Sequence, residues 1–185
     1  RDVFQQTHMN NLQGNIGIGH VRYPTAGGVG KEFAQPMYVN TPYGISLAHN
    51  GNLTNSKKLA AELFHAERRH INTESDSEVL LNIFALELSK QEAVFPKPKD
   101  FFAAVEKTHL RINGAYAVVA LITGYGILAF RDPLGIRPLT IGVRKGENRN
   151  EYVVSSETAH FSATGFKVLR DVEPGEAVFI DNSGK

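Results

Sequence analysis

The sequence contains no cysteine among its 185 residues. This absence excludes disulfides, thiolate zinc sites, iron–sulfur ligation and a cysteine nucleophile from these residues. An excess of one charge is also lacking, because 20 Lys and Arg balance 19 Asp and Glu to a net charge of +1. We therefore expect no broad attraction to nucleic acids or membrane surfaces. No apolar run approaches the roughly 20 residues of a membrane-spanning helix and no signal-peptide pattern opens the chain, which favours a cytoplasmic protein.

The remaining composition is ordinary for one folded domain. Hydrophobic residues make up 42% and charged residues 21% of the chain, and its length is sufficient to bury a core. Since no repeat or low-complexity segment divides the sequence, we expect residues 1–185 to form a single domain. The chain opens on Arg1 rather than an initiator methionine, and we expect it to be a processed or trimmed part of a longer protein.

Helical patterns gather in the middle of the chain. Apolar residues at helical spacing predict helices from residue 54 or 55 to about 69, from Ser75 to about 88, and from Asp100 to about 110. Ser75 and Glu78 have the spacing of a capping box, and Asp100 is expected to cap its helix.

Strand patterns surround these helices. Their loops are too short for crossover helices, so the sheets should be mostly antiparallel and the fold a layered α+β fold. The expected strands cover residues 16–21, 45–49, 115–123, 127–131, 138–143, 152–155 and 176–180.

Two segments next to strands suggest ligand-binding groups. Arg22 follows a strand pattern and precedes a loop rich in glycine, so it could hold a carboxylate beneath a moving loop, or equally well pair with a structural acid. Asn50 and Gly51 follow the expected strand 45–49. A carboxamide and a backbone N–H there could form an oxyanion hole, although Asn-Gly is also a common turn.

Asp76 lies in the first turn of the second expected helix. It could simply complement the helix dipole, but Ser75 already supplies a cap, which leaves Asp76 able to accept hydrogen bonds from an ammonium group. Arg22 for a carboxylate, Asp76 for an amine and Asn50 with Gly51 for a carbonyl oxygen together fit an amino-acid amide.

Other polar residues point less clearly to chemistry. The seven histidines lack the spacing of a metal site, and His20 and His49 are expected to be structural or supporting residues. Ser155 or Ser156 with Glu157 and His160 could indicate a serine hydrolase, but no nucleophile elbow surrounds them, and Ser156 with Glu157 is more typical of a helix start.

Longer motifs resemble one enzyme family along almost the whole chain. The sequence resembles the glutaminase domain of the amidophosphoribosyltransferases, the glutamine-dependent enzymes that open purine biosynthesis. The motifs that carry the resemblance are GIGHVRYPTAGG, LAHNGNLTN, NTESDSEVLLNIFA, GAYAVVALITG, AFRDPLGIRPL and VVSSETAHF. The resemblance implies the αββα four-layer sandwich of N-terminal-nucleophile hydrolases, in agreement with the layered α+β expectation.

The resemblance also implies roles for individual residues. Arg22 would hold the α-carboxylate of glutamine and Asp76 its α-amino group, while Asn50 and Gly51 would stabilise the tetrahedral oxyanion. The segment 22–30 would close over the substrate, with Tyr23 and Thr25 counted among the substrate-binding residues and Tyr23 relaying to a neighbouring domain.

The chain departs from this family in what it lacks. Family members hydrolyse glutamine with an N-terminal cysteine and pass ammonia to a phosphoribosyltransferase domain. Neither the cysteine nor that domain is present in this sequence. We therefore expect the sandwich to be incomplete at its N-terminus and this chain alone to be inactive. We expect an open sheet edge or cleft beside Asn50.

Further expectations follow from the resemblance. No cofactor is expected in this segment, Mg²⁺ is expected in the missing transferase domain, and the parent enzyme should be a homo-oligomer. The alternative function is a non-catalytic module of the same fold that binds an amino acid or docks a partner.

Overall fold

The computed structural model describes residues 5–21, 31–91 and 93–184. Two short 3-10 helices occupy Lys31–Phe33 and Ser162–Thr164. The α-helices are α1 (Gln6–Asn11), α2 (Ser56–His65), α3 (Asp76–Ser89) and α4 (Pro98–Arg111). The strands are β1 (Met37–Val39), β2 (Ile45–Leu53), β3 (Gly114–Ile122), β4 (Gly126–Arg131), β5 (Thr140–Lys145), β6 (Asn150–Ser155), β7 (Lys167–Asp171) and β8 (Ala177–Asp181).

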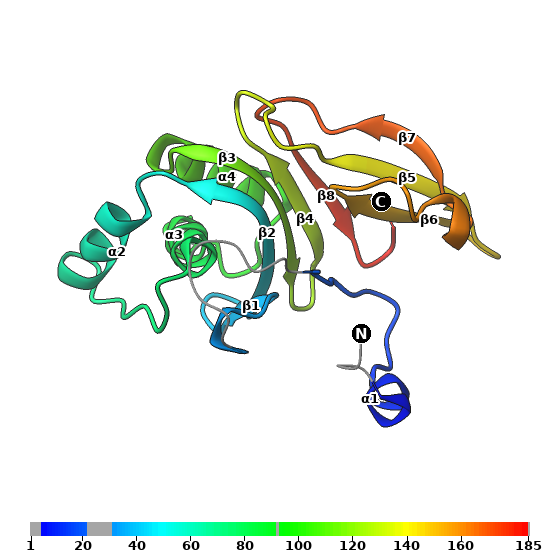
Figure 1. The fold of residues 1–185 in the computed structure, drawn as a ribbon, viewed down its shortest axis with the longest axis horizontal. Helices are drawn as coiled ribbons and strands as arrows, with labels where there is room; N and C mark the ends of the chain where they lie inside the picture. Colours follow the sequence, from blue (N-terminus) through cyan, green and yellow to red (C-terminus); the bar gives the residue numbers. More distant parts are fainter. Residues whose placement is uncertain (1–4, 22–30, 92, 185) are drawn as a thin grey trace.

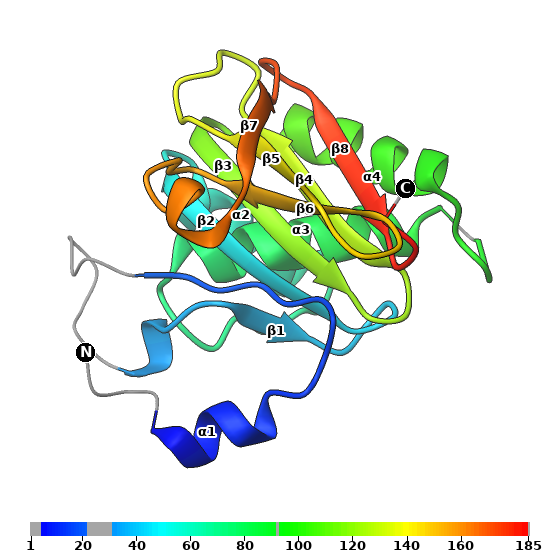
Figure 2. The same cartoon turned by 90° about the vertical axis from the view of Figure 1, so that its right-hand side faces the viewer.

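The described residues build three layers. A five-stranded sheet in the order β1-β2-β3-β4-β8 lies between the helices α2, α3 and α4 on one face and a three-stranded sheet in the order β6-β5-β7 on the other (Figure 1). Turned by a quarter, the molecule shows β5, β6 and β7 in front of β3 and β4 (Figure 2). Every strand pair is antiparallel. The α+β class and the antiparallel sheets are therefore confirmed.

Helix α3 is the centre of the helix layer. Ser75 caps it, since its Oγ accepts a hydrogen bond from the backbone N–H of Ser77 at 3.3 Å. The twelve residues from Ser77 to Leu88 are all buried, because α2, α4 and the five-stranded sheet surround this helix. Apolar side chains of α3 such as Phe84 pack on Leu128 and Phe130 of β4 within one continuous core.

The capping box predicted at the start of α3 is wrong. Glu78 instead accepts four hydrogen bonds of 2.7 to 2.8 Å from the backbone and side chains of Asn72 and Thr73. Burial raises the pKa of Glu78, but these four hydrogen bonds outweigh burial and hold the pKa below its usual value. The carboxylate therefore ties the preceding loop to α3.

Other element boundaries also differ from the predictions. Residues 16–21 form no strand, because they pair with no described strand. Helix α2 ends at His65 rather than about 69, and Arg68 has a φ of +56°, which lies outside the right-handed helical region. Helix α4 starts at Pro98, and Asp100 lies inside its first turn, where its carboxylate accepts the N–H of Lys97 at 2.8 Å. No helix of the described residues is long and apolar enough to cross a membrane.

Candidate functional site

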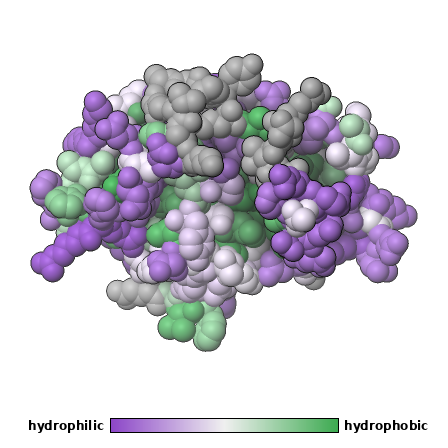
Figure 3. Space-filling view, turned by 60° about the horizontal axis from the view of Figure 1, so that its bottom comes forward, coloured by the Kyte–Doolittle hydropathy of each residue, from purple (hydrophilic) through white to green (hydrophobic). Residues whose placement is uncertain are grey.

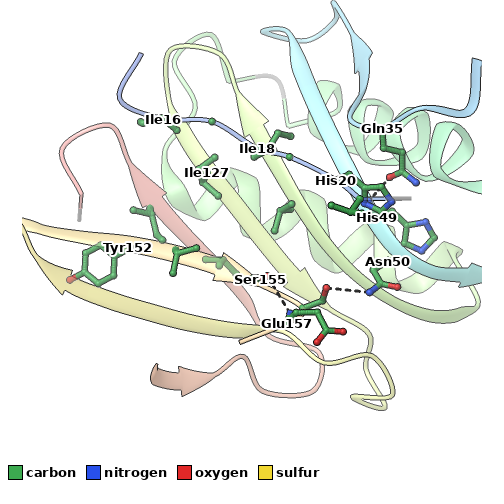
Figure 4. A pocket seen from close by; sticks show the side chains of 18 of the residues that line it. Ile16, Ile18, His20, Gln35, His49, Asn50, Ile127, Tyr152, Ser155 and Glu157 are labelled. Atoms are coloured by element: carbon green, nitrogen blue, oxygen red, sulfur yellow. Dashed lines mark hydrogen bonds between the residues drawn. The ribbon is translucent and has the colours of Figure 1, made fainter. Parts of the chain in front are cut away.

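A cavity of about 1370 Å³ lies between the two sheets. Its middle is apolar, with Ile16 and Ile18 lying near Ile127 of β4, and its polar end holds His49 and Asn50 of β2 (Figure 4). In the space-filling view, hydrophobic and neutral residues occupy the middle of one face between hydrophilic regions (Figure 3). The candidate site is the polar end of this cavity.

Strand β2 does not end at Asn50-Gly51 as predicted, and the alternative of an Asn-Gly turn is wrong too. The strand continues to Leu53, and Gly51 pairs with Tyr116 of β3. Gly51 has a φ of +152°, and a Cβ at this position would lie 2.0 Å from the carbonyl oxygen of Ala115. Glycine is required here because the two strand backbones approach too closely for a side chain.

The backbone amides of β2 alternate between two edges. Thr54 donates its N–H to the carbonyl of Asn113 at 2.8 Å, and Thr123 donates to the carbonyl of Gly44 at 3.0 Å, so the even-numbered residues of β2 face β3. The odd-numbered amides face the opposite edge, where β1 pairs only with residues 45–47. Among the described strands, none covers this edge beside Asn50, as expected from the sequence.

Side-chain oxygens accept hydrogen bonds from two of the backbone amides on that edge. The N–H of His49 donates to Oε1 of Gln35 at 2.7 Å, and the N–H of Leu53 donates to Oδ2 of Asp76 at 2.9 Å. The amide of Gly51 lies between them and points to the same edge. The carboxylate of Asp76 is thus held against this edge at Leu53, two residues beyond the amide of Gly51.

The carboxamide of Asn50 has a partner at each end. Its Oδ1 accepts a hydrogen bond from Nη2 of Arg137, and its Nδ2 donates to Oγ of Ser156 at 3.2 Å. Because an arginine only donates, the oxygen of Asn50 must face Arg137 and the nitrogen must face Ser156. The Oγ of Ser156 therefore shows a position at which an oxygen atom can accept a hydrogen bond from Nδ2 of Asn50. Ser156 starts no helix, contrary to prediction.

Asp76 reaches the same edge from the start of α3. Its Oδ2 accepts a hydrogen bond from the backbone N–H of Leu53. The carboxylate is therefore less free than the sequence suggested. A carboxylate has about four acceptor positions, and Asp76 lines the cavity. It can accept a further donor while it remains attached to β2.

His49 supports the site from the helix-covered face of β2. Its ring Nδ1 lies 3.1 Å from Oγ of Ser77. Burial lowers the pKa of His49 to about 4; Asp76 opposes this change, whereas His20 and Arg137 reinforce it. The ring is therefore neutral at pH 7, which fits a supporting role rather than that of a base.

The structure joins some of the predicted residues and leaves others untested. Asn50, Gly51 and Asp76 line the same cavity, while Arg22, Tyr23 and Thr25 lie outside the described residues. Sequence reasoning missed Gln35 and Arg137, and it considered Ser156 only as a hydrolase serine or a helix start. Arg137 and Ser156 fall within the motifs AFRDPLGIRPL and VVSSETAHF. Within the described part of the chain, no group of three His, Asp or Glu side chains is placed to hold a metal ion.

The family profile of the glutamine amidotransferase domain matches residues 29–163, which include Asn50, Gly51 and Asp76. The chain belongs to this family. It is 57% identical over 185 residues to the amidophosphoribosyltransferases of Pseudomonas aeruginosa and of Escherichia coli. All of the chain aligns with each of them but spans only 37% of their length.

A solved structure shares the amidotransferase fold. The glutamine phosphoribosylpyrophosphate amidotransferase from B. subtilis, complexed with ADP and GMP, is 35% identical with a TM-score of 0.69. The match covers 89% of this chain and 32% of that one. This neighbour confirms the expected N-terminal-nucleophile fold, of which the described residues form one helix layer and both sheets.

Proposed function

We propose that this chain is the glutamine-binding part of an amidophosphoribosyltransferase. In this function glutamine is hydrolysed to glutamate, and the ammonia passes to phosphoribosyl pyrophosphate to form phosphoribosylamine for purine synthesis. The observation that carries the proposal is that Asn50, Gly51 and Asp76 line the same cavity, with the carboxylate of Asp76 held at the edge of β2. The 57% identity to named enzymes of this activity supports the same function.

The two donors on β2 fit the demands of amide hydrolysis. Attack on the side-chain carbonyl of glutamine places a negative charge on its oxygen, and donors already aimed at that position lower the barrier. Nδ2 of Asn50 has two hydrogens, of which one meets Ser156, and the second would serve the substrate. The amide of Gly51 is the proposed second donor.

The remaining groups of glutamine are assigned by charge. Asp76, whose carboxylate is stabilised by the positive end of the α3 dipole, would accept the α-ammonium group, and the guanidinium of Arg22 would pair with the α-carboxylate. Tyr23 and Thr25 would contribute to the loop over the substrate. These assignments rest on the resemblance of the motifs and on the position of Asp76 at the cavity.

The nucleophile would come from outside the 185 residues, since they contain no cysteine. We propose that an N-terminal cysteine segment and a phosphoribosyltransferase domain complete a cytoplasmic, homo-oligomeric enzyme. Mg²⁺ would act in the transferase domain, and this chain itself would need no cofactor. Alone, the chain should hydrolyse no glutamine.

The decisive experiment replaces Asn50 in the complete enzyme. Asn50→Ala should lower kcat for glutamine-dependent glutamate release by about 10²- to 10³-fold, the effect of losing one oxyanion donor. The KM for glutamine should change little, and synthesis from free ammonia should be unchanged because it bypasses this step. Asn52→Ala, a matched change two residues along the strand at an exposed position, should leave both activities near wild type.

The other function considered from the sequence predicts a different result. A non-catalytic amino-acid-binding or docking module would bind glutamine in calorimetry without releasing glutamate, even in the complete protein. Glutamine binding without turnover would therefore overturn the proposed enzyme and favour the binding module.

A further inference from the structure

The loop between β4 and β5 is fixed by two adjacent charged residues. Asp132 is fully buried, and its carboxylate accepts the backbone N–H groups of Ile136 at 2.9 Å and Arg137 at 3.0 Å. Arg131 holds the same loop from its other side and donates to the carbonyls of Gly135 and Arg137, both at 2.6 Å. The backbone at Arg137 is thus fixed on both its N–H and its C=O.

This fixed loop delivers one side chain to the candidate site. Nη2 of Arg137 donates to Oδ1 of Asn50, a residue 87 positions earlier in the chain. It is the one hydrogen bond found for this guanidinium among the described residues, and the buried Nε has no acceptor there. The contact is therefore the main polar interaction of Arg137 rather than one of many.

The chemistry of this pair orients the carboxamide. A side-chain amide can flip by half a turn and exchange its oxygen and nitrogen, but an arginine cannot accept a hydrogen bond. A flip would put the Asn50 nitrogen against a cation and turn its oxygen toward Ser156 and the cavity. An oxygen facing the cavity would repel an oxyanion, whereas the observed orientation presents a donor.

We propose that Arg137 is a positioning residue for the glutaminase reaction, because it locks the Asn50 carboxamide with its N–H groups toward the substrate. The positive charge of Arg137 beside Oδ1 also polarises the amide and strengthens Nδ2 as a donor. This inference rests on the proposed function and adds to it a residue that contacts Asn50 rather than the substrate. Arg131 and Asp132 serve the site by holding the loop that carries Arg137.

The first test compares variants of Arg137 in the complete enzyme. Arg137→Ala should lower kcat for glutamine hydrolysis about tenfold, less than the loss of the donor itself, with KM for glutamine and ammonia-dependent synthesis unchanged. Arg137→Lys should restore much of kcat, since an ammonium group also only donates. Arg144→Ala is the matched control, because Arg144 also lines the cavity but pairs with Glu151, and it should leave kcat unchanged.

A double-mutant cycle separates positioning from general structural support. If Arg137 acts through Asn50, then Arg137→Ala should have no further effect on kcat in an Asn50→Ala background. Independent, multiplying losses would overturn the inference. If Asn50→Ala alone leaves kcat unchanged, the proposed oxyanion role fails instead, so that the two failures remain distinct.

A measurement without turnover tests the orientation itself. In protein labelled with ¹⁵N-asparagine, the side-chain NH₂ signals of Asn50 are those lost in Asn50→Asp. Arg137→Ala should shift these signals and speed their hydrogen exchange, Arg137→Lys should shift them less, and Arg144→Ala should not shift them. Unchanged Asn50 signals in Arg137→Ala would overturn the inference whatever the activity.

Discussion

The two faces of the five-stranded sheet differ in how they are covered. On the helix side, β2, β3 and β4 share a continuous core with α2, α3 and α4, which includes fully buried side chains such as Phe84 and Phe130. On the other side, the core with the second sheet consists of five small or medium residues, Ala117, Ala129, Leu139, Ile141 and Val172. Beside that small core lies the cavity of about 1370 Å³.

This difference separates stability from chemistry. Apolar burial stabilises by roughly 25 cal/mol for each Å² removed from water, so the helix-covered face should supply most of the free energy of folding. The face toward the second sheet leaves room for a ligand and for polar groups at the strand edge. Because the helix-covered face supplies the stability, the residues of the site can carry polar groups without having to fill a core.

The largest effect expected from this comparison is in the helix-side core. Phe84 is fully buried and its ring lies 6.0 Å from that of Phe130, so Phe84→Ala should cost about 3 to 5 kcal/mol of unfolding free energy. Ile127→Ala on the cavity face should cost only about 1 kcal/mol, because that side chain is partly exposed already. Urea unfolding of both variants measures the difference, and equal losses would contradict the division between the faces.

A second effect concerns the backbone at the site. Gly51→Ala should cost about 4 kcal/mol, since it combines a backbone conformation that L-residues avoid with a clash against Ala115. Gly124→Ala is the control, with a φ of +83° but no atom within 4 Å of the added Cβ, and should cost about 1 kcal/mol. Thermal or urea unfolding should rank the two variants in this order. A Gly51→Ala protein as stable as Gly124→Ala would mean that β2 and β3 do not pair as closely as described.

The smallest expected effect is a change in the pH dependence of stability, caused by His49. Its folded pKa of about 4 lies below the ordinary value of 6.5, so the unfolded chain binds more protons between these pH values. Its contribution to stability is complete above pH 6.5 and is lost as the pH falls toward 4, by about 3 kcal/mol over that window. His49→Gln should flatten the dependence of unfolding free energy on pH in this range. His160→Gln, at an exposed histidine, should keep the wild-type slope, and an unaltered slope in His49→Gln would show that the ring is not buried in its neutral form.

The helix layer could be predicted from the sequence because its signals are local. Helix α3 was predicted from a cap at Ser75 and a long apolar run, and the structure confirms both. By contrast β7 is exposed along its whole length, so it has no alternation of apolar residues to reveal it. Helix α1 buries none of its residues and β1 has only three, and neither gives a periodic pattern.

The site was predictable only in part, because only some of its signals are local in the sequence. Asn50, Gly51 and Asp76 stood out because residue type and position suggested their chemistry. Their supports did not, because Arg137 and Ser156 meet Asn50 from 87 and 106 residues away. Such pairings arise from the stacking of the two sheets, which local periodicity does not encode.

The occupied amides along β2 have a consequence for solubility. An exposed strand edge normally offers a row of donors and acceptors on which a strand of another molecule can align and start aggregation. Here the side chains of Gln35 and Asp76 take up the donors on either side of Gly51. An incoming strand would have to displace both, whereas one small acceptor can reach the donor between them, so this edge admits a ligand more easily than a second polypeptide.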